Sequence, residues 1–269
     1  MKKISTEIDA FGIATVTMAN PDKHNAFDDA VIAELHEAFI SLDANDSVRI
    51  VVLAAQGKSF SAGADLNWMK RMAGYSYEDN YKDAQALADM LYALNTLTKP
   101  TIARVQGAAY GGAVGLVSCC DIAIGTPRAA FSLSEAKIGL APATISPYVI
   151  DAIGQRASRR YFLTAERFDA QTALQLGLLS EVVEEDQLDA TIDTFINILL
   201  ANSPKAITAG KKLIFDVANR PVDAELRDRT SELIARLRVT EEGQEGLRAF
   251  LEKNKPNWIV NRPSSAGKE

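Results

Sequence analysis

The stretch IARVQGAAYGGAVGLVSCCDIAIG, residues 102–125, decides the fold of this chain. Glycine and alanine crowd its centre, and from residue 108 onward no side chain charged at neutral pH appears before Asp121. Short apolar runs at both ends are typical of strands that are covered on both faces, and the segment 112–119 between them predicts a short helix. A strand, a glycine-rich turn, a helix and another strand in this order indicate an α/β fold, whose functional sites lie at strand ends.

The chain before this stretch repeats the alternation of strand and helix. β-Branched and continuous apolar runs predict strands, and apolar residues at helical spacing predict helices. The predicted strands cover 12–19, 48–55, 101–107 and 121–125, and the predicted helices begin at Asp28, Tyr77 and residue 112. Turn-forming and glycine-rich segments separate them. We therefore expect a mixed α/β core over residues 1–185.

The C-terminal part of the chain carries helical patterns without strand signals. It covers residues 186–260, and the pattern over 186–254 predicts three helices. Ser203 followed by Pro204 is typical of an N-cap and the first residue of a helix. Such a region cannot bury all its apolar faces alone, so we expect it to dock on the core or on another subunit. The polar tail, 261–269, is expected to be disordered.

Composition excludes several functional classes. The chain has 269 residues, 47% of them hydrophobic, and a net charge of −6 with acidic and basic residues interspersed, which argues against a nucleic-acid partner. No apolar run reaches the ~20 residues of a membrane span, and the N-terminus lacks the apolar segment of a signal peptide. Cys119 and Cys120 are neighbours, which disfavours a disulfide between them, and no other Cys or His lies nearby to complete a zinc site. We expect a cytoplasmic protein without a metal.

Two short glycine-rich loops share one design. SAGAD, residues 61–65, and AYGGA, residues 109–113, each follow a predicted strand and precede a helix. The backbone N–H groups at a helix start have no partner within the helix, and two of them aimed at one point form an oxyanion hole. Small side chains allow a ligand oxygen to reach the backbone. The alternative is that both loops are only tight turns, whereas the motifs of nucleotide-phosphate loops are absent.

The stretch that decides the fold, over 102–122, resembles the signature of the enoyl-CoA hydratase/isomerase, or crotonase, superfamily. Other segments resemble the same family in the same order along nearly the whole chain. They are NPDKHNAF (20–27), FSAGADL (60–66), EAKIGLAP (135–142), the AxxxGL pattern from Ala173 to Leu178, and EGQEGLRAFLEKNKP (242–256).

The resemblance implies a fold, an assembly and a substrate. The fold would be the crotonase (ClpP-like) spiral of repeated ββα units, with a helical C-terminal trimerisation region over 186–260. The chain would assemble as a homotrimer or a dimer of trimers. The substrate would be an acyl-CoA thioester. No separate cofactor is expected, because coenzyme A is part of the substrate.

The resemblance also assigns residues to the site. The oxyanion donors would be the N–H groups of Ala64 and Gly112, and Glu135 would be the acid/base. Adenine would lie near the backbone of Ala62 and Ala64, and Lys23 would lie near the CoA phosphates. Lys255 of a neighbouring subunit is a further candidate for the phosphates. The residues expected to bind substrate are Lys23, Ala62, Ala64, Asp65, Gly111, Gly112 and Gly115.

One position departs from the family pattern. Hydratases of this family commonly hold the attacking water between two glutamates; the second corresponds to Glu135, but the first corresponds to Gly115. A single carboxylate can hydrate an enoyl-CoA if the water is positioned in another way, and it suffices to move a double bond. The leading prediction is therefore an enoyl-CoA hydratase. The alternatives are a Δ3,Δ2-enoyl-CoA isomerase, an acyl-CoA hydrolase, and a catalytically weakened acyl-CoA-binding relative.

The sequence around the second loop narrows the expected substrate. The segments YGGAVGLVSCCDIAIG (110–125) and GLAPATISPYVI (139–150) resemble bacterial methylglutaconyl-CoA and isohexenylglutaconyl-CoA hydratases. Such a substrate carries a second carboxylate, for which Lys70 and Arg71 are the nearest basic candidates in sequence. Both also fit an exposed helix face. Asp65 and Asp121 are expected to cap helices or fix turns rather than to do chemistry.

Overall fold

The computed structural model of the chain describes residues 3–260 and Arg262. The predicted disorder of 261–269 therefore concerns positions that, apart from Arg262, lie outside the described residues. The chain divides into two compact units. The first extends to Leu97 and includes Thr101–Ile192, and the second contains Thr98–Pro100 and the chain from Asp193 onward.

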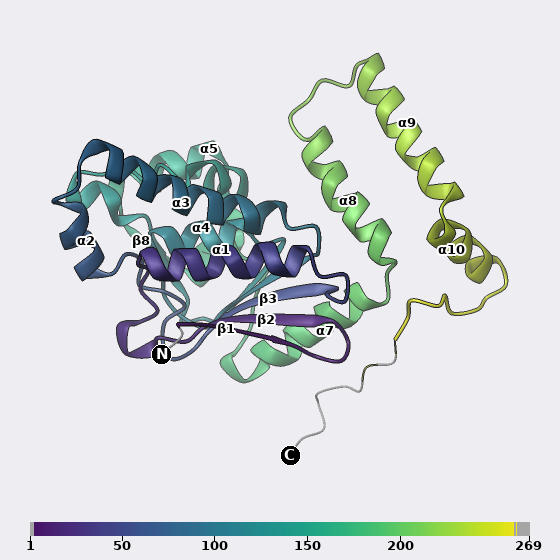
Figure 1. Cartoon of the computed structure of the whole chain (residues 1–269), viewed down its shortest axis with the longest axis horizontal. Coiled ribbons are helices and arrows are strands. Elements are labelled where there is room, and N and C mark those ends of the chain that lie inside the picture. Colours follow the sequence, from purple (N-terminus) through teal and green to yellow (C-terminus); the bar gives the residue numbers. More distant parts are fainter. Residues whose placement is uncertain (1–2, 261, 263–269) are drawn as a thin grey trace. The chain divides into compact units, whose positions relative to one another are not determined.

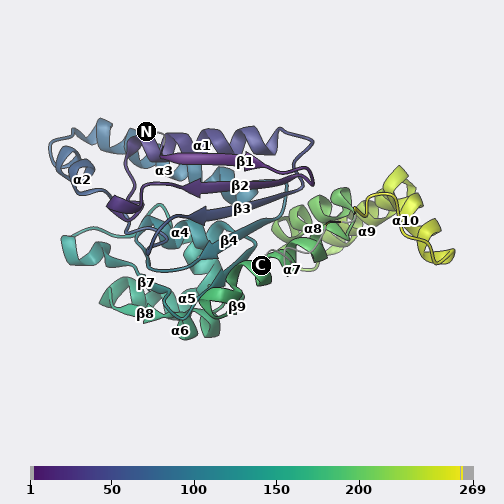
Figure 2. The same cartoon turned by 90° about the horizontal axis from the view of Figure 1, so that it is seen from below.

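A six-stranded sheet forms the centre of the first unit (Figure 2). Its strands follow the order β1-β2-β3-β4-β6-β9, with β1 and β2 antiparallel and every other pair parallel. All residues of β3 are buried, as the continuous apolar run predicts for a strand covered on both faces. The strands are β1 (Ile4–Ile8), β2 (Ile13–Met18), β3 (Ile50–Ala55), β4 (Thr101–Val105), β6 (Ile122–Gly125) and β9 (Glu181–Val182).

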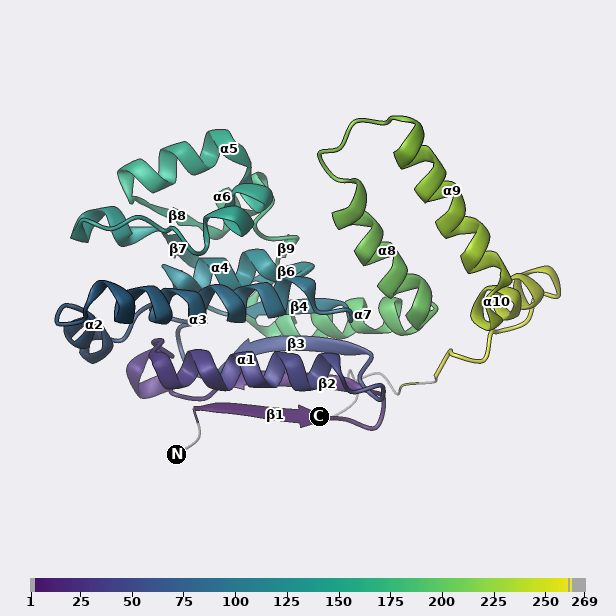
Figure 3. The same ribbon diagram turned by 45° about the horizontal axis from the view of Figure 1, so that its top comes forward.

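Two long helices, α1 (Asp29–Asp43) and α3 (Tyr77–Thr96), pack side by side over one face of this sheet (Figures 1 and 3). The side chain of Asp28 caps α1 by accepting a hydrogen bond from the amide of Val31. Apolar residues at helical spacing, such as Leu35 of α1 and Leu94 of α3, are fully buried. Both helices start where the sequence predicts, since polar caps precede an apolar face at each start.

A second, three-stranded sheet lies beside the glycine-rich stretch. It consists of β5 (Ala109–Tyr110), β7 (Ala130–Ser132) and β8 (Arg167–Asp169), with β5 parallel and β8 antiparallel to β7. Its apolar face is anchored by Phe131 and Phe168, whose ring centroids are 5.4 Å apart. The remaining elements of the first unit are η1 (Pro21–Lys23), α2 (Leu66–Met72), α4 (Gly112–Cys119), η2 (Ser134–Ile138), α5 (Ser146–Thr164), α6 (Ala170–Leu176) and η3 (Glu185–Gln187).

The second unit is helical. Its helices are α8 (Pro204–Val217), α9 (Ala224–Val239) and α10 (Glu241–Leu251), while α7 (Leu188–Leu200) runs across the division between the units. Ser203 caps α8 by accepting from the amide of Ala206, as predicted.

The prediction of three helices over 186–254 is wrong, because four α-helices occupy this range. Thr240 has an extended backbone and ends α9, and its side chain accepts from the amide of Gly243 to start α10. Gly243 permits this sharp break, since a Cβ there would lie 2.0 Å from the carbonyl oxygen of Leu237. The mixed α/β class with helices at the C-terminus is nevertheless confirmed. None of the helices in the described part of the chain is long and apolar enough to cross a membrane.

Candidate active site

The two glycine-rich loops lie side by side. Ser61 and Ala109 form a parallel bridge, in which the amide of Ser61 donates to the carbonyl of Ala108 and the amide of Tyr110 donates to the carbonyl of Ser61, each at 3.0 Å. Gly63 has a φ of +88°, and a Cβ there would lie 3.0 Å from the carbonyl oxygen of Tyr110. This close approach explains the small residue, because a side chain at Gly63 would push the loops apart.

The first loop leaves the amide of Ala64 free. Phe27 bridges to Ala64, with the Phe27 amide donating to Gly63 at 2.7 Å and the Asp65 amide donating to Phe27 at 2.6 Å. In a parallel bridge of this kind, the N–H and C=O groups of the middle residue point away from the partner segment. No acceptor for the Ala64 amide occurs among residues 3–260 and 262. This N–H is thus available to a ligand.

The second loop presents a comparable amide at Gly112. Gly112 is the first residue of α4, so its N–H has no acceptor within the helix. The neighbouring amides are engaged, since that of Gly111 donates to Ser132 and that of Val114 donates to Gly111, both at 2.9 Å. The described residues offer the Gly112 amide no acceptor. The structure therefore places a free N–H on each of two adjacent loops.

Glu135 lies next to the second loop, in η2. The hydrogen bond from Gly111 to Ser132 and the pairing of β5 with β7 bring the chain that carries Glu135 alongside Gly111. Its Oε1 lies 3.3 Å from the position that a Cβ on Gly111 would take. Its Oε2 is buried and has no hydrogen-bond partner in the described part of the chain. Burial raises the pKa of Glu135, and a hydrogen bond from its own amide opposes this only in part.

The space beside Gly115 is filled by hydrocarbon. A Cβ at Gly115 would lie 2.3 Å from Cγ2 and 2.8 Å from Cβ of Ile145, and 3.3 Å from a methyl group of Leu91. Ile145, at the start of α5, is only 1% exposed. The structure thus supplies no carboxylate at Gly115 and no room for a side chain there.

Asp65 has the structural role that the sequence predicts. Its Oδ1 caps α2 by accepting from the amides of Asn67 at 2.8 Å and Trp68 at 3.1 Å, and its Oδ2 forms an ion pair with Lys23 at 3.2 Å. Burial alone would raise the pKa of Asp65, but the amides and the Lys23 ammonium hold it below its usual value. Asp65 therefore fixes the end of the first loop as an ionised cap.

The residues assigned to CoA lie around the first loop. The Nζ atom of Lys23 is beside Asp65, while 53% of the Lys23 side chain remains exposed. The amide of Ala62 donates to the carbonyl of His24 at 2.9 Å, so a contact between Ala62 and adenine would use the Ala62 carbonyl. Lys255 is exposed and belongs to the second unit.

Two buried amide side chains that the sequence reasoning missed hold the first loop in place. Asn25, 2% exposed, donates to the carbonyls of Gln56 and Ser59 and accepts from the amide of Asn20. Gln106, 6% exposed, donates to carbonyls of the same segment, those of Ala55, Gly57 and Ser59. Gln106 is a polar residue that directly follows the apolar end of a strand, which is a signal that sequence reasoning can use, whereas Asn25 lies in a polar segment and carries no such signal.

The basic side chains near the loops differ in their availability. Arg71 forms an ion pair with Asp29 at 2.5 Å, whereas Lys70 has no ion pair within the described residues.

A further cation was missed by sequence reasoning. The Arg167 guanidinium lies 4.9 Å from the ring centroid of Tyr110, which directly precedes the Gly111–Gly112 turn. Cross-strand register sets this contact, because Tyr110 and Arg167 both pair with Ser132. Within the described residues Arg167 has no ion pair.

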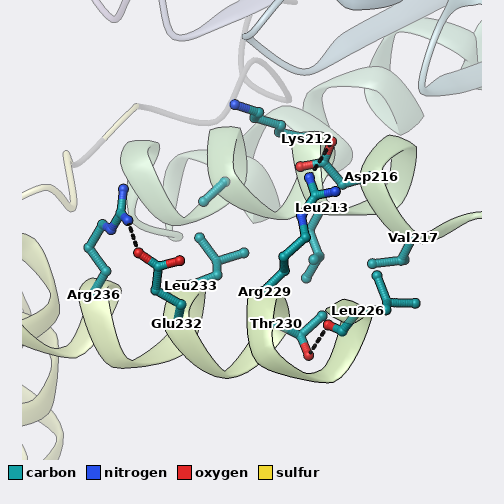
Figure 4. Close-up of a pocket in the computed structure, with 11 residues that line it drawn as sticks. Lys212, Leu213, Asp216, Val217, Leu226, Arg229, Thr230, Glu232, Leu233 and Arg236 are labelled. Carbon is teal, nitrogen blue, oxygen red and sulfur yellow. Dashed lines mark hydrogen bonds and ion pairs between the residues drawn. The ribbon is translucent and has the colours of Figure 1, made fainter. Parts of the chain in front are cut away.

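The second unit contains a hollow of a different kind between α8 and α9 (Figure 4). It measures about 270 Å³ and is lined by apolar side chains, including Leu213, Leu226 and Leu233. Its lining also includes Lys212 and two ion pairs: Arg229 lies 3.9 Å from Asp216, and Arg236 pairs with Glu232. Large apolar side chains also lie exposed on this unit; they include Ile214, Phe215, Ile234 and Phe250. This surface is suited to protein contacts rather than to acid/base chemistry.

Two free backbone amides on adjacent loops, with a buried carboxyl group beside them, are typical of enzymes that stabilise a developing oxyanion. Comparison with known proteins gives the family. The family model "Enoyl-CoA hydratase/isomerase" matches residues 9–261, nearly the whole chain. The chain therefore belongs to the enoyl-CoA hydratase/isomerase family, which confirms the crotonase fold.

Solved structures and curated relatives agree with this membership. An enoyl-CoA hydratase from Shewanella pealeana is 50% identical, with a TM-score of 0.92 over 95% of this chain and 96% of its own. An enoyl-CoA hydratase from Mycobacterium smegmatis is 32% identical, with a TM-score of 0.91 over 97% of this chain and all of its own. The enoyl-CoA hydratase ACTT6 of Alternaria alternata is 33% identical over 79% of this chain and 70% of its own.

Proposed function

We propose that this chain is an enoyl-CoA hydratase that uses Glu135 as its only acid/base. The observation that carries the proposal is the buried, partnerless Oε2 of Glu135 beside a loop pair with free amides at Ala64 and Gly112. The names of the relatives from Shewanella and Mycobacterium support the same reaction. The function thus depends on backbone amides for charge stabilisation and on a single side chain for proton transfer.

In this proposal the thioester oxygen accepts hydrogen bonds from Ala64 and Gly112. Negative charge accumulates on that oxygen as the enolate forms, so the two donors bind the transition state more strongly than the substrate. Each donor of this kind contributes about 3 kcal/mol. Around the first loop, Lys23 would neutralise CoA phosphate and the Ala62 carbonyl would accept from adenine. Asp65 would keep the loop rigid without contacting the reacting atoms.

Glu135 would carry both proton transfers. The ionised carboxylate removes a proton from water while the hydroxide oxygen bonds to Cβ, and the electron pair of the double bond moves onto the thioester oxygen. The protonated Glu135 then returns the proton to Cα, and the enolate collapses to the 3-hydroxyacyl thioester. The raised pKa of Glu135 helps both steps, because it brings the acid and base forms closer in energy near neutral pH.

A Δ3,Δ2-enoyl-CoA isomerase is the second candidate, and the packing at Gly115 favours it. Ile145 fills the space beside Gly115, so this position supplies no second carboxylate to orient a water molecule. Isomerisation needs no water: Glu135 would remove a proton from Cα of the 3-enoyl thioester and return it to Cγ. The same two amides would stabilise the dienolate between these steps.

We further propose a branched substrate of the methylglutaconyl type. The sequence resemblance around 110–125 and 139–150 supports it. The second carboxylate of such a substrate needs a cation, and the structure offers Lys70 and Arg167 without ion pairs in its described part, whereas Arg71 is occupied by Asp29. Arg167 also lies next to the second loop through Tyr110.

The helical second unit would serve assembly in this proposal. The hollow between α8 and α9 and the exposed apolar residues of α8, α9 and α10 are suited to contacts with other copies of the chain. A homotrimer or a dimer of trimers, in the cytoplasm, remains the prediction.

Turnover of three thioesters separates the candidates. The purified protein is incubated with crotonyl-CoA, 3-methylglutaconyl-CoA and a 3-enoyl-CoA, and the absorbance of the conjugated thioester is followed. Loss of this absorbance with 3-methylglutaconyl-CoA is the expected result for the proposed hydratase. A gain with the 3-enoyl-CoA would assign the isomerase instead. An inert protein that still binds CoA thioesters would overturn both enzymatic proposals.

A further inference from the structure

Two glycines of α4 lie on the same face of the helix. Gly112 and Gly115 are separated by three positions, which places them one above the other, about 4.5 Å apart along the helix axis. Gly112 carries the free amide of the second loop. Gly115 thus lies next to the candidate site, one turn further along α4 than Gly112.

Side chains from two other helices close this position. Ile145 belongs to the start of α5 and Leu91 belongs to α3, and both approach the place that a Cβ on Gly115 of α4 would take. Ile145 is 1% exposed and Leu91 is fully buried. The three nearest atoms to this position are all carbon, so they offer a water molecule no hydrogen bond.

We propose that Ile145 is a specificity-determining residue. Its side chain occupies the space that a side chain at position 115 would need, and so restricts the site to reactions that one carboxylate can complete. The proposal rests on the proposed function and deepens it. Glycine at 115 and isoleucine at 145 form one packing unit, and neither can change alone without strain or a cavity. The unit keeps hydrocarbon where a second acid would otherwise face the substrate.

A double-substitution cycle tests the packing unit by thermal unfolding. Gly115→Glu alone should lower the thermal midpoint by roughly 5–10 °C, because its Cβ would overlap Ile145. Ile145→Gly alone should lower it through a cavity; glycine is chosen because an alanine would keep its Cβ 2.8 Å from that of residue 115. Position 145 is the N-cap of α5, where glycine is tolerated. The double variant should be more stable than the sum of the two losses predicts.

Strictly additive losses, or a Gly115→Glu variant as stable as the parent, would overturn the proposal. This arm does not depend on turnover. If the parent protein fails to act on any of the three thioesters, the proposed function fails while the packing unit is still tested.

An activity arm tests the chemical consequence. Hydration of crotonyl-CoA by Gly115→Glu/Ile145→Gly should be about 10-fold faster than by Ile145→Gly, because the second carboxylate can orient the water. The matched control is Gly115→Gln/Ile145→Gly, which has almost the same shape but no charge. It should hydrate no faster than Ile145→Gly. Equal rates for the Glu and Gln double variants would show that position 115 does not face the reacting water, and would overturn the proposal.

Discussion

Gly111 and Gly115 lie on neighbouring turns of the same segment but are glycine for different reasons. At Gly111 the backbone adopts φ +53° and ψ −123°, and the Glu135 carboxyl group lies directly opposite. At Gly115 the backbone is ordinary helix, and Ile145 takes the space of the missing side chain. Gly111 allows the backbone conformation of the second loop, and Gly115 leaves room for the side chain of Ile145. The polar and the hydrocarbon sides of the candidate site are separated by a single helical turn.

In the proposed function, this difference leaves one carboxyl group to carry both proton transfers. Glu135 is desolvated by its surroundings, and none of the described residues bonds its Oε2. A second acid at position 115 would help to orient the water, but it would also add a like charge near Glu135. With Ile145 there instead, the pKa of Glu135 is set by burial rather than by a like charge.

The largest effect is expected for Glu135→Gln, which removes the carboxyl group opposite Gly111. Turnover should fall by about 10²–10⁴-fold, because no other group replaces the acid/base. Stability should change in the opposite direction. Burial raises the pKa of Glu135, so its ionised form destabilises the folded protein at neutral pH, and the Gln variant should melt at a higher temperature there.

The pH dependence of this gain provides its control. The gain should vanish as the pH falls below the ordinary pKa of a glutamate, since both side chains are then neutral in the folded and the unfolded protein. The parent's kcat should also fall as the pH drops through the raised pKa of Glu135. A Gln variant that turns over substrate as fast as the parent would assign the acid/base role to another residue.

A pair of alanine substitutions compares the two glycines directly. Gly115→Ala should cost about 1–3 kcal/mol of unfolding free energy, because its Cβ would meet Ile145. Gly111→Ala should cost about 1–3 kcal/mol through its positive φ and should also lower kcat, since it displaces Glu135 and the adjacent Gly112 amide. Urea unfolding and initial rates measure both terms. If kcat falls equally in the two variants once folding is restored by low temperature, the proposed division between polar and packing glycines is wrong.

Local signals in the sequence predict much of the fold. The buried run of β3, the Asp28 cap of α1 and the Ser203–Pro204 start of α8 each depend on neighbouring residues, and the structure confirms them. The break at Thr240 was missed because it depends on a close approach between Gly243 and the preceding helix.

The candidate site was predictable to a similar extent. The loops and Glu135 stand out through their residue types and the family resemblance, and the structure places them together. Ile145 and Arg167 were not predictable, because their meaning arises from contacts with Gly115 and Tyr110, which are distant in sequence. An isoleucine at a helix start and an arginine on a short strand carry no local mark of function.

The smallest effect is expected for Lys23, which lies on the polar side but away from the reacting atoms. Lys23→Gln should raise KM for a CoA thioester several-fold and leave kcat unchanged, because an exposed ammonium contributes to phosphate binding only through a screened charge. Lys58→Gln, an exposed lysine from the same loop region, is the matched control and should have little effect. The difference in KM between the two variants should shrink as salt is added. Since the ion pair of Lys23 with Asp65 is half exposed, the free energy of unfolding should fall by no more than about 1 kcal/mol. A fall in kcat would contradict this prediction and would mean that Lys23 acts through the Asp65 cap on the first loop.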